Sequence, residues 1–170
     1  MSEDQPIYNS TSKTFPLHSS PVELKLLHDN FKNGKWNIPD YATDGSAAVD
    51  ILAAIDESAV IQPQETQLIS SGLSFWIKDP NLALIMIPRS GAGCKLHITL
   101  GNTVGLIDSD YQGELKMCLF NKTNDDITIE PGQYICQVML IPKIHMNISV
   151  VNEFSNKTDR GEKGFGHSRK

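Results

Sequence analysis

Short apolar segments separated by glycine and proline constrain the fold of this chain more than any other feature. The segments recur at roughly ten-residue intervals, a spacing typical of all-β barrels and sandwiches. We therefore predict an all-β fold, a barrel or jelly roll, with strands in the segments 22–27, 41–54, 64–71, 73–78, 82–87, 127–130, 133–141 and 144–154.

Little of the chain suits a helix. The small residues of segment 41–54 are compatible with a helix start, but the short segments that follow favour a strand there. The remaining positions for a helix are around Asn81–Met86 or just after Ser90, and Lys32–Asp40 resembles a loop.

The length of 170 residues suits one domain with a substantial core. Residues 1–21 are rich in serine and threonine and contain three prolines, so we expect a mobile N-terminal tail. Residues 22–154 would form the β domain. Residues 155–170 would form a polar, glycine-containing C-terminal arm that cannot bury a core of its own.

Composition excludes several classes of function. The net charge of −5 argues against a general nucleic-acid binder. No run of about 18 apolar residues and no signal-peptide pattern occurs, so we expect a soluble cytoplasmic protein with no membrane partner. Cys94, Cys118 and Cys136 are odd in number and lack a CxxC spacing, which is typical of free thiols in a reducing compartment. The five histidines are scattered, so a zinc site held by protein ligands is not expected.

The stretch Gly101–Glu114 carries the most chemistry. Apolar residues lead into Asp108, a polar turn at Ser109-Asp110, and then Tyr111 beside Gly113. The pattern predicts two strands that form a hairpin around Ser109-Asp110. Taken alone, it also fits an ordinary hairpin with an acidic tip.

Arginine is rare and placed selectively. The chain has twelve lysines but three arginines, Arg89 in a Pro-Arg-Ser-Gly sequence and Arg160 and Arg169 in the terminal arm. Arginine is preferred where a planar fork must bind phosphate oxygens, and neighbouring glycine and serine supply further donors. Together with the acidic, aromatic hairpin, this pattern indicates a ligand that carries phosphate.

Five short motifs, in order along residues 22–168, resemble those of the homotrimeric dUTPases, close to the bacterial form. They are Ala47-Ala48-Val49-Asp50-Ile51, Pro88-Arg89-Ser90-Gly91, Gly105-Leu106-Ile107-Asp108-Ser109-Asp110-Tyr111-Gln112-Gly113-Glu114, Pro131-Gly132-Gln133-Tyr134-Ile135-Cys136-Gln137 and Arg160-Gly161-Glu162-Lys163-Gly164-Phe165-Gly166-His167-Ser168. The resemblance implies a homotrimer of jelly rolls, each a distorted β-barrel, whose C-terminal arm crosses to a neighbouring active site.

The resemblance also implies an activity: Mg²⁺-assisted hydrolysis of dUTP to dUMP and pyrophosphate by in-line attack of water at the α-phosphorus. Such an enzyme limits uracil incorporation into DNA and supplies dUMP for thymidylate synthesis. Asp108 would be the catalytic residue, activating the water and holding the sugar 3′-hydroxyl. Asp50 and Gln137 would reach the magnesium ion indirectly, through its water ligands. The residues that the resemblance places against the substrate are Arg89, Ser90, Gly91, Asn102, Gly105, Leu106, Asp108, Tyr111, Met117, Arg160, Phe165, Gly166, His167 and Ser168.

Individual roles follow the same resemblance. Tyr111 would pack on the deoxyribose and exclude a 2′-hydroxyl, and Asn102 with the backbone near Gly105 would pair with the uracil edge. Arg89, Ser90 and Gly91 would bind the phosphate chain. In the closed arm, Phe165 would stack on uracil while Arg160, His167 and Ser168 bind the β- and γ-phosphates.

Simpler explanations exist for several of these residues. Asp50 also fits the simpler role of a strand-end carboxylate that accepts a hydrogen bond from a backbone N–H. Gln137 also fits the role of a side chain that hydrogen-bonds neighbouring strands, and His167 that of a solvated tail residue. Alternation around Cys118 indicates a strand buried on both faces rather than thiol chemistry.

The chain departs from the family pattern at two positions. Tyr134 stands where an arginine is usual, and Arg169 stands where a glycine is usual. The first change removes or replaces an arginine–carboxylate contact between subunits.

Two other functions fit parts of the pattern. A dCTP deaminase has a similar fold and trimer, but it would need a glutamate base and would lack the arm with Phe165. A nucleotide-sensing protein that docks on a regulator is suggested only by the N-terminal leader.

Overall fold

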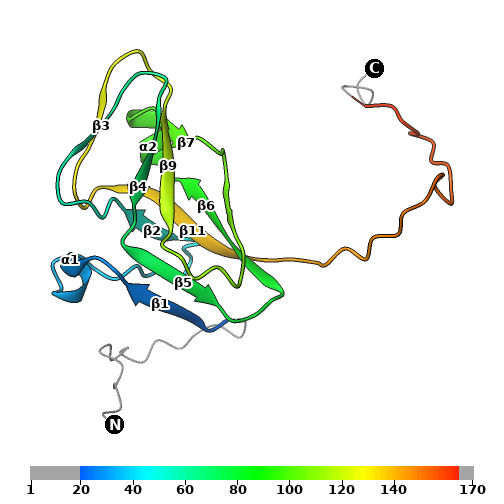
Figure 1. The fold of residues 1–170 in the computed structure, drawn as a ribbon, viewed down its shortest axis with the longest axis horizontal. Helices are drawn as coiled ribbons and strands as arrows, with labels where there is room; N and C mark the ends of the chain where they lie inside the picture. The colour runs from blue at the N-terminus through cyan, green and yellow to red at the C-terminus, as the bar shows by residue number, and fades with distance from the viewer. Residues whose placement is uncertain (1–19, 165–170) are drawn as a thin grey trace, which may run out of the picture.

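The structure, a computed structural model, describes residues 20–164. This part of the chain folds into strands joined by loops, with two short helices (Figure 1). The strands are β1 (Val22–Leu26), β2 (Val49–Leu52), β3 (Ala59–Ile61), β4 (Thr66–Ser70), β5 (Leu73–Ile77), β6 (Leu82–Pro88), β7 (Ile98–Leu100), β8 (Gly105–Ile107), β9 (Lys116–Asn121), β10 (Ile127–Ile129) and β11 (Tyr134–Pro142), and the helices are α1 (Asp29–Lys32) and α2 (Ser90–Lys95).

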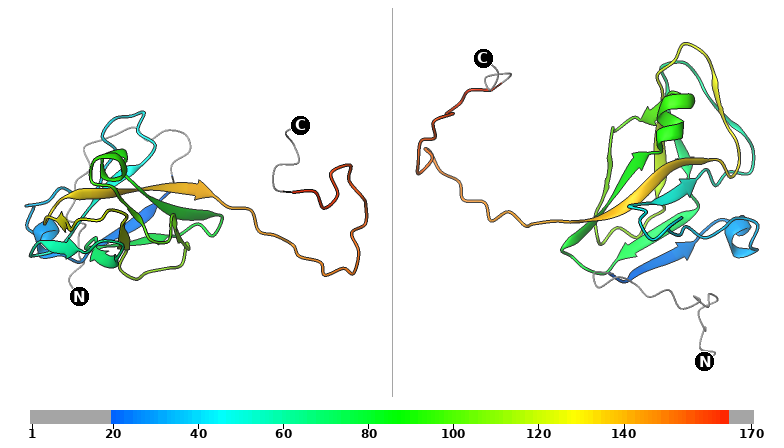
Figure 2. Two further views of the ribbon diagram at one scale, coloured as in Figure 1. Left: turned by 90° about the horizontal axis from the view of Figure 1, so that it is seen from above. Right: turned by 180° about the vertical axis from the view of Figure 1, so that it is seen from behind.

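The strands pair antiparallel in four sheets, which confirms the all-β prediction. The largest has the order β2-β11-β6-β8, the next β4-β9-β7, and the pairs β1-β5 and β10-β3 complete the set. Within residues 20–164 these sheets do not close into one barrel, and their layered arrangement agrees with the predicted jelly roll. Figure 2 shows the layers from above and from behind.

The core lies between the two larger sheets, because one face of each presents apolar side chains inward. In β9 the burial alternates strictly, and Met117 and Leu119 are fully buried. From the opposing sheet Ile51, Leu84 and Val138 join the same core cluster. Burial of this apolar surface is the main stabilising contribution to the fold.

One buried polar residue fixes the loops at the end of β9. The amide of Asn121 donates to the carbonyls of Ile61 and Asp125, at 2.9 and 2.8 Å. Its oxygen accepts from the backbone N–H and the hydroxyl of Thr123. All of its hydrogen-bonding groups are satisfied, so its burial carries no desolvation penalty from unpaired groups.

Of the two helices, α2 was predicted from the sequence and α1 was not. A helix just after Ser90 is confirmed by α2, whereas the alternative at Asn81–Met86 is wrong because most of that segment forms β6. As an inner strand, β6 is paired on both sides, which explains its continuous apolar sequence. Helix α1 was not predicted; it is a single turn anchored by buried Phe31 and capped by the His28 ring, which accepts from the N–H of Asn30.

The predicted hairpin around Ser109-Asp110 is also wrong. Strand β8 pairs with β6, with Ile107 opposite Leu84, and β9 pairs with β4 and β7. Residues 108–115 therefore cross from the edge of one sheet to the middle of another. Alternation in sequence identifies a strand but does not identify its partner.

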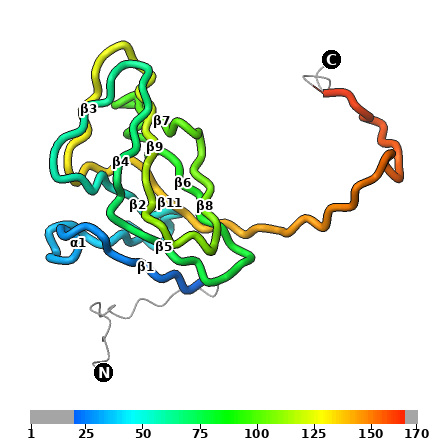
Figure 3. Tube along the Cα trace, in the orientation of Figure 1, coloured from blue at the N-terminus to red at the C-terminus, as the bar shows by residue number. Residues whose placement is uncertain are grey.

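The predicted strand at 144–154 is not formed in the single chain. The backbone there has no strand pairing, and Ile144 and Val150 are 95% and 96% exposed. The segment runs away from the sheets as an extended arm, coloured orange to red in Figures 1 and 3. A strand requires a hydrogen-bonded neighbour, and this part of the chain offers none. Within residues 20–164 no helix is long and apolar enough to span a membrane.

Candidate functional site

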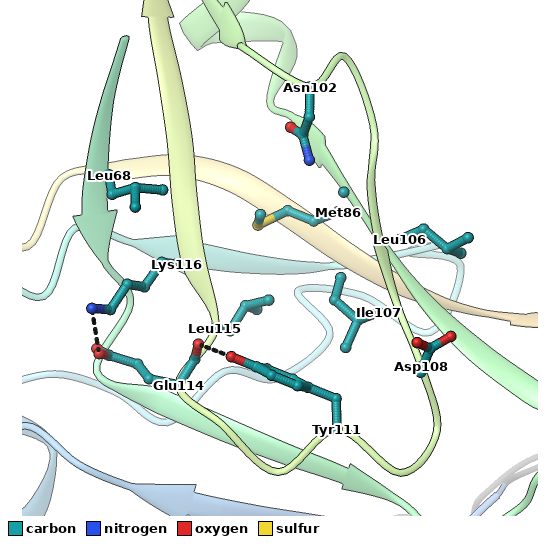
Figure 4. Close-up of a pocket in the computed structure, with 11 residues that line it drawn as sticks. Leu68, Met86, Asn102, Leu106, Ile107, Asp108, Tyr111, Glu114, Leu115 and Lys116 are labelled. Carbon is teal, nitrogen blue, oxygen red and sulfur yellow. Dashed lines mark hydrogen bonds and ion pairs between the residues drawn. The ribbon is translucent and has the colours of Figure 1, made fainter.

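A cavity of about 610 Å³ opens between the edge of the four-stranded sheet and the three-stranded sheet. One wall is β8 with Met86 of β6, and the other comes from β4 and β9 (Figure 4). Five predicted site residues line it: Asn102, Gly105, Leu106, Asp108 and Tyr111. The cavity therefore brings together the predicted catalytic carboxylate of Asp108, the ring of Tyr111 and the side-chain amide of Asn102.

Close backbone packing shapes the wall formed by β8. A Cβ on Gly105 would lie 3.2 Å from two carbons of Met86, so glycine allows β8 to lie tightly against β6. The preceding loop turns sharply, with Thr103 at φ 64° and the N–H of Val104 donating to the Asn102 carbonyl at 2.8 Å. In Figure 4 the Asn102 side chain points toward the space beside Met86.

Tyr111 is held in a defined orientation. Its N–H donates to the Asp108 carbonyl at 3.2 Å, which closes a turn, and its hydroxyl donates to the Glu114 carbonyl at 3.1 Å. The ring lies directly over Gly113, where an added Cβ would meet the phenol oxygen at 2.4 Å. Asp108, at the head of this turn, has an exposed carboxylate.

Glu114 anchors the turn to the body of the protein. Its carboxylate accepts hydrogen bonds from the hydroxyl of Ser70, the last residue of β4, and from the N–H of Gly72 in the turn to β5, the latter at 3.2 Å. Lys116 lies 3.8 Å away on the same carboxylate. Charge-assisted bonds to a backbone N–H are stronger than neutral ones, so the loop between Asp108 and Glu114 is tied at its far end.

A second cluster forms where β2, β11 and the end of β6 meet. The Arg89 Nε lies 2.9 Å from an Asp50 carboxylate oxygen. Gln137 is opposite Asp50 across the β11–β2 pair, and its amide nitrogen donates to the Pro88 carbonyl at 3.4 Å. Ser90 and Gly91 follow as the exposed first residues of α2.

Asp108, at one end of the cavity, and the Arg89 cluster lie at opposite ends of β6. Ile107 is opposite Leu84, and Arg89 follows Leu84 by five residues, while Asp108 lies one step further in the other direction. At about 3.3 Å per residue, the backbones of Asp108 and Arg89 are about 20 Å apart. The Arg89 side chain also points toward β2, away from β8.

The remaining predicted residues lie elsewhere. Met117 does not line the cavity, because its side chain is fully buried on the inward face of β9. Arg160 lies on the extended arm, where its Nε donates to the Lys163 carbonyl at 2.8 Å. The predictions for Phe165, Gly166, His167, Ser168 and Arg169 fall outside the described residues.

Sequence reasoning missed several residues of the cavity. Leu68, Met86 and Lys116 contribute to its walls, and Glu114 both lines it and anchors its loop. Glu114 closes one of the motifs, so its position was a usable signal. The other three belong to strands whose pairing the sequence does not reveal.

Between residues 20 and 164, no group of three or more histidine, cysteine, aspartate or glutamate side chains is arranged to hold a metal ion directly. Asp50 and Gln137 do suit an indirect role. One carboxylate oxygen of Asp50 is paired with Arg89, and Gln137 uses its amide nitrogen on Pro88. The second Asp50 oxygen and the Gln137 oxygen are acceptors of the kind that bind metal-bound water.

Comparisons with known proteins give a consistent result. Residues 34–169 match the family model for dUTPase. The deoxyuridine 5'-triphosphate nucleotidohydrolase of Idiomarina loihiensis is 50% identical over 147 residues, which cover 86% of this chain and 96% of that protein. That of Haemophilus influenzae is 49% identical over 149 residues, with 88% and 97% covered.

Solved structures agree on the fold. The dUTPase of Staphylococcus bacteriophage 80alpha with dUPNHPP aligns with a TM-score of 0.75 at 25% identity, over 88% of this chain and 99% of that one. A mutant dUTPase from phage phi11 of S. aureus, described with a structural Mg(II) ion, aligns with a TM-score of 0.69 at 20% identity, over 80% and 99% of the two chains.

Proposed function

Since this chain belongs to the dUTPase family and hydrolyses dUTP, we propose that it does so at sites shared between the subunits of a homotrimer. The observation that carries this proposal is the separation of about 20 Å between Asp108 and Arg89 along β6. Within one chain the Arg89 side chain is bound to Asp50 on the β2 side of the sheet, so it points away from a nucleotide placed beside Asp108. A neighbouring copy must therefore bring its Arg89 cluster to the Asp108 cavity.

The exposed arm supports association. Ile144, Met146, Ile148 and Val150 alternate with polar residues and are each at least 74% exposed. Alternation with period two is the pattern of a strand with one buried face. A second, more apolar groove of about 550 Å³ lies between β1-β5 and the four-stranded sheet, lined by side chains such as Val22, Phe75 and Leu140. The arm of a neighbouring copy would bury its apolar face there and gain the pairing that a lone chain cannot supply.

At the cavity, Asp108 would accept a proton from the attacking water. Its carboxylate is exposed at the head of the turn, free to orient a water against the α-phosphorus. Attack forms the new P–O bond as the bond from the α-phosphorus to the bridging oxygen breaks. The products are dUMP and pyrophosphate.

Tyr111 and Asn102 would select the substrate. The Tyr111 ring is held by its contact with Gly113 and by its hydrogen bond to the Glu114 carbonyl. In this orientation it would offer a flat surface to the deoxyribose and would leave no room for a 2′-hydroxyl. The Asn102 amide and the backbone around Gly105 would pair with the uracil edge, and close packing there would exclude a 5-methyl group.

Arg89, Ser90 and Gly91 would bind the phosphates from the neighbouring subunit. The pairing with Asp50 fixes the guanidinium plane, and fixed donors stabilise developing charge better than mobile ones.

Magnesium bound to the phosphates would offset charge on the leaving pyrophosphate, while Asp50 and Gln137 would hold its water ligands in place. Arg160 and the residues beyond it would close over the nucleotide.

The free thiols support a cytoplasmic location. All three cysteines are free, with Cys136 buried and Cys94 exposed. Thiols persist in a reducing environment, so we place the enzyme in the cytoplasm.

A nucleotide panel tests this function. The protein is incubated with dUTP, UTP, dTTP and dCTP, and pyrophosphate and ammonia are both measured. We expect pyrophosphate from dUTP, with UTP and dTTP cleaved on the order of a thousandfold more slowly because a hydroxyl or methyl must be forced against packed groups. Ammonia from dCTP would instead indicate a deaminase, and comparable kcat/KM for UTP and dUTP would contradict the assigned selectivity.

A further inference from the structure

Tyr134 occupies the position where the motif resemblance leads one to expect an arginine, and the structure shows what it contacts. The residue begins β11, with its side chain 40% exposed. The Arg89 guanidinium carbon lies 5.6 Å from the centre of its ring. That distance is within the range of a cation–π interaction.

The backbone is shaped to make this contact. In the pairing of β11 with β2, Tyr134 is opposite Leu52 and Cys136 opposite Ile51, so the register shifts between them. A bulge of this kind re-aims a side chain relative to a regular strand. On the other side the Arg89 N–H donates to the Ile135 carbonyl at 2.9 Å, which fixes the residue after β6 against the bulge.

The Arg89 side chain has three partners within one chain. Its Nε is bound to Asp50 at 2.9 Å, one Nη1 donor points to the Tyr134 carbonyl at 3.4 Å, and the ring of Tyr134 covers one side. A guanidinium has five N–H donors, so three remain for a ligand. These three lie in a plane whose orientation the other contacts define.

We propose that Tyr134 is a positioning residue for Arg89: its ring replaces a charged contact with a flat surface that holds the guanidinium fork at the angle required to bind phosphate. The inference rests on the proposed function, in which Arg89 contacts the phosphate chain. A ring serves here because it restricts Arg89 without competing for its donors and without adding a second positive charge next to it.

Three substitutions separate the face of the ring from its bulk and its hydroxyl. Tyr134→Phe keeps the ring, Tyr134→Leu keeps an apolar side chain without a π face, and Tyr134→Ala removes both. Each is made in the full chain and again in an Arg89→Ala background. The readouts are the affinity for a non-hydrolysable dUTP analogue by calorimetry, kcat and KM for dUTP, and the thermal midpoint of unfolding.

We expect Tyr134→Phe to match the parent, while Tyr134→Leu and Tyr134→Ala lose about fivefold in affinity for the analogue, with unchanged unfolding midpoints. In the Arg89→Ala background the same changes should have no further effect, because the residue acts only through Arg89.

Parent-like affinity in Tyr134→Leu, or a loss that persists in full without Arg89, would overturn the inference. Parent-like affinity in Arg89→Ala itself would instead show that Arg89 does not bind the phosphates, which contradicts the proposed function and this inference with it.

Discussion

Adding one methyl group at Gly113 should damage substrate selectivity with little effect on stability. The backbone at Gly113 is not in the left-handed region, so alanine is conformationally acceptable. Its Cβ, however, would lie 2.4 Å from the Tyr111 hydroxyl oxygen and 2.5 Å from the ring carbon that bears it. Contacts this short cannot persist, and Tyr111 must move.

The size of the effect follows from the surroundings of Tyr111. The side chain is 47% exposed, so it can swing into solvent rather than strain the core. The cost is then the hydrogen bond to the Glu114 carbonyl, about 1 kcal/mol. The ring would no longer lie across the deoxyribose, and the preference for dUTP over UTP should fall by about tenfold or more.

The assay is kcat/KM for dUTP and UTP in Gly113→Ala, beside thermal unfolding. Gly45→Ala is the matched control, because nothing lies within 4 Å of the Cβ position there. Tyr111→Phe isolates the hydroxyl. Selectivity that stays at the parent value in Gly113→Ala, with Tyr111 shown to have moved, would refute the role of the ring as the sugar sensor.

Three further predictions follow from the site, the arm and the cysteines. Asp108→Asn should fold normally and bind a non-hydrolysable dUTP analogue, while turnover falls by about a hundredfold or more; near-normal kcat would move the base elsewhere, with Asp110 the next candidate. Deletion from Asp159 onward should leave a folded trimer with severely impaired catalysis, and normal hydrolysis of dUTP by the truncated protein would exclude Arg160 from the site. Burial raises the pKa of the Cys136 thiol from its ordinary value of 9.0 to about 12, so its stabilising contribution is complete below pH 9 and is lost as the pH rises toward 12. A thiol reagent at pH 8 should therefore modify Cys94 rapidly and Cys136 only after unfolding, and rapid modification of Cys136 in the folded protein would contradict its burial.

The strands of this fold were largely predictable because they depend on local sequence. Segments 22–27, 73–78 and 82–87 correspond closely to β1, β5 and β6, since alternating or continuous apolar segments next to a glycine or proline specify a strand locally. The predicted segment 41–54 contains β2, but only Val49–Leu52 forms it. The short β3, at Ala59–Ile61, was missed because three residues are too few to show a period.

Pairing was less predictable than strand content. Residues 108–115 are short enough for a hairpin loop, yet β8 pairs with β6 and β9 with β4 and β7. The observed arrangement includes the close packing of Gly105 on Met86, a contact between separate segments that local alternation does not reveal. The same limitation hid Leu68 and Met86 as walls of the cavity.

The segment 144–154 shows a different limitation. Its alternation correctly indicates one apolar face, but within a single chain Ile144 and Val150 have nothing to cover them. A pattern in sequence records the contacts of the assembled protein, and its partner need not lie in the same chain. The separation of Asp108 from Arg89 is a second, independent observation that supports the proposed association of subunits.

Co-refolding of two inactive variants tests the shared site most directly. Asp108→Ala and Arg89→Ala are each purified, mixed in equal amounts, unfolded and refolded together, and dUTP hydrolysis is compared with each variant refolded alone. If a site takes Asp108 from one subunit and Arg89 from the next, every mixed trimer contains one intact site. Random mixing then restores about a quarter of the parent activity. If both residues came from the same chain, every site would keep one defect, and trimers shown by mass spectrometry to be mixed would remain inactive.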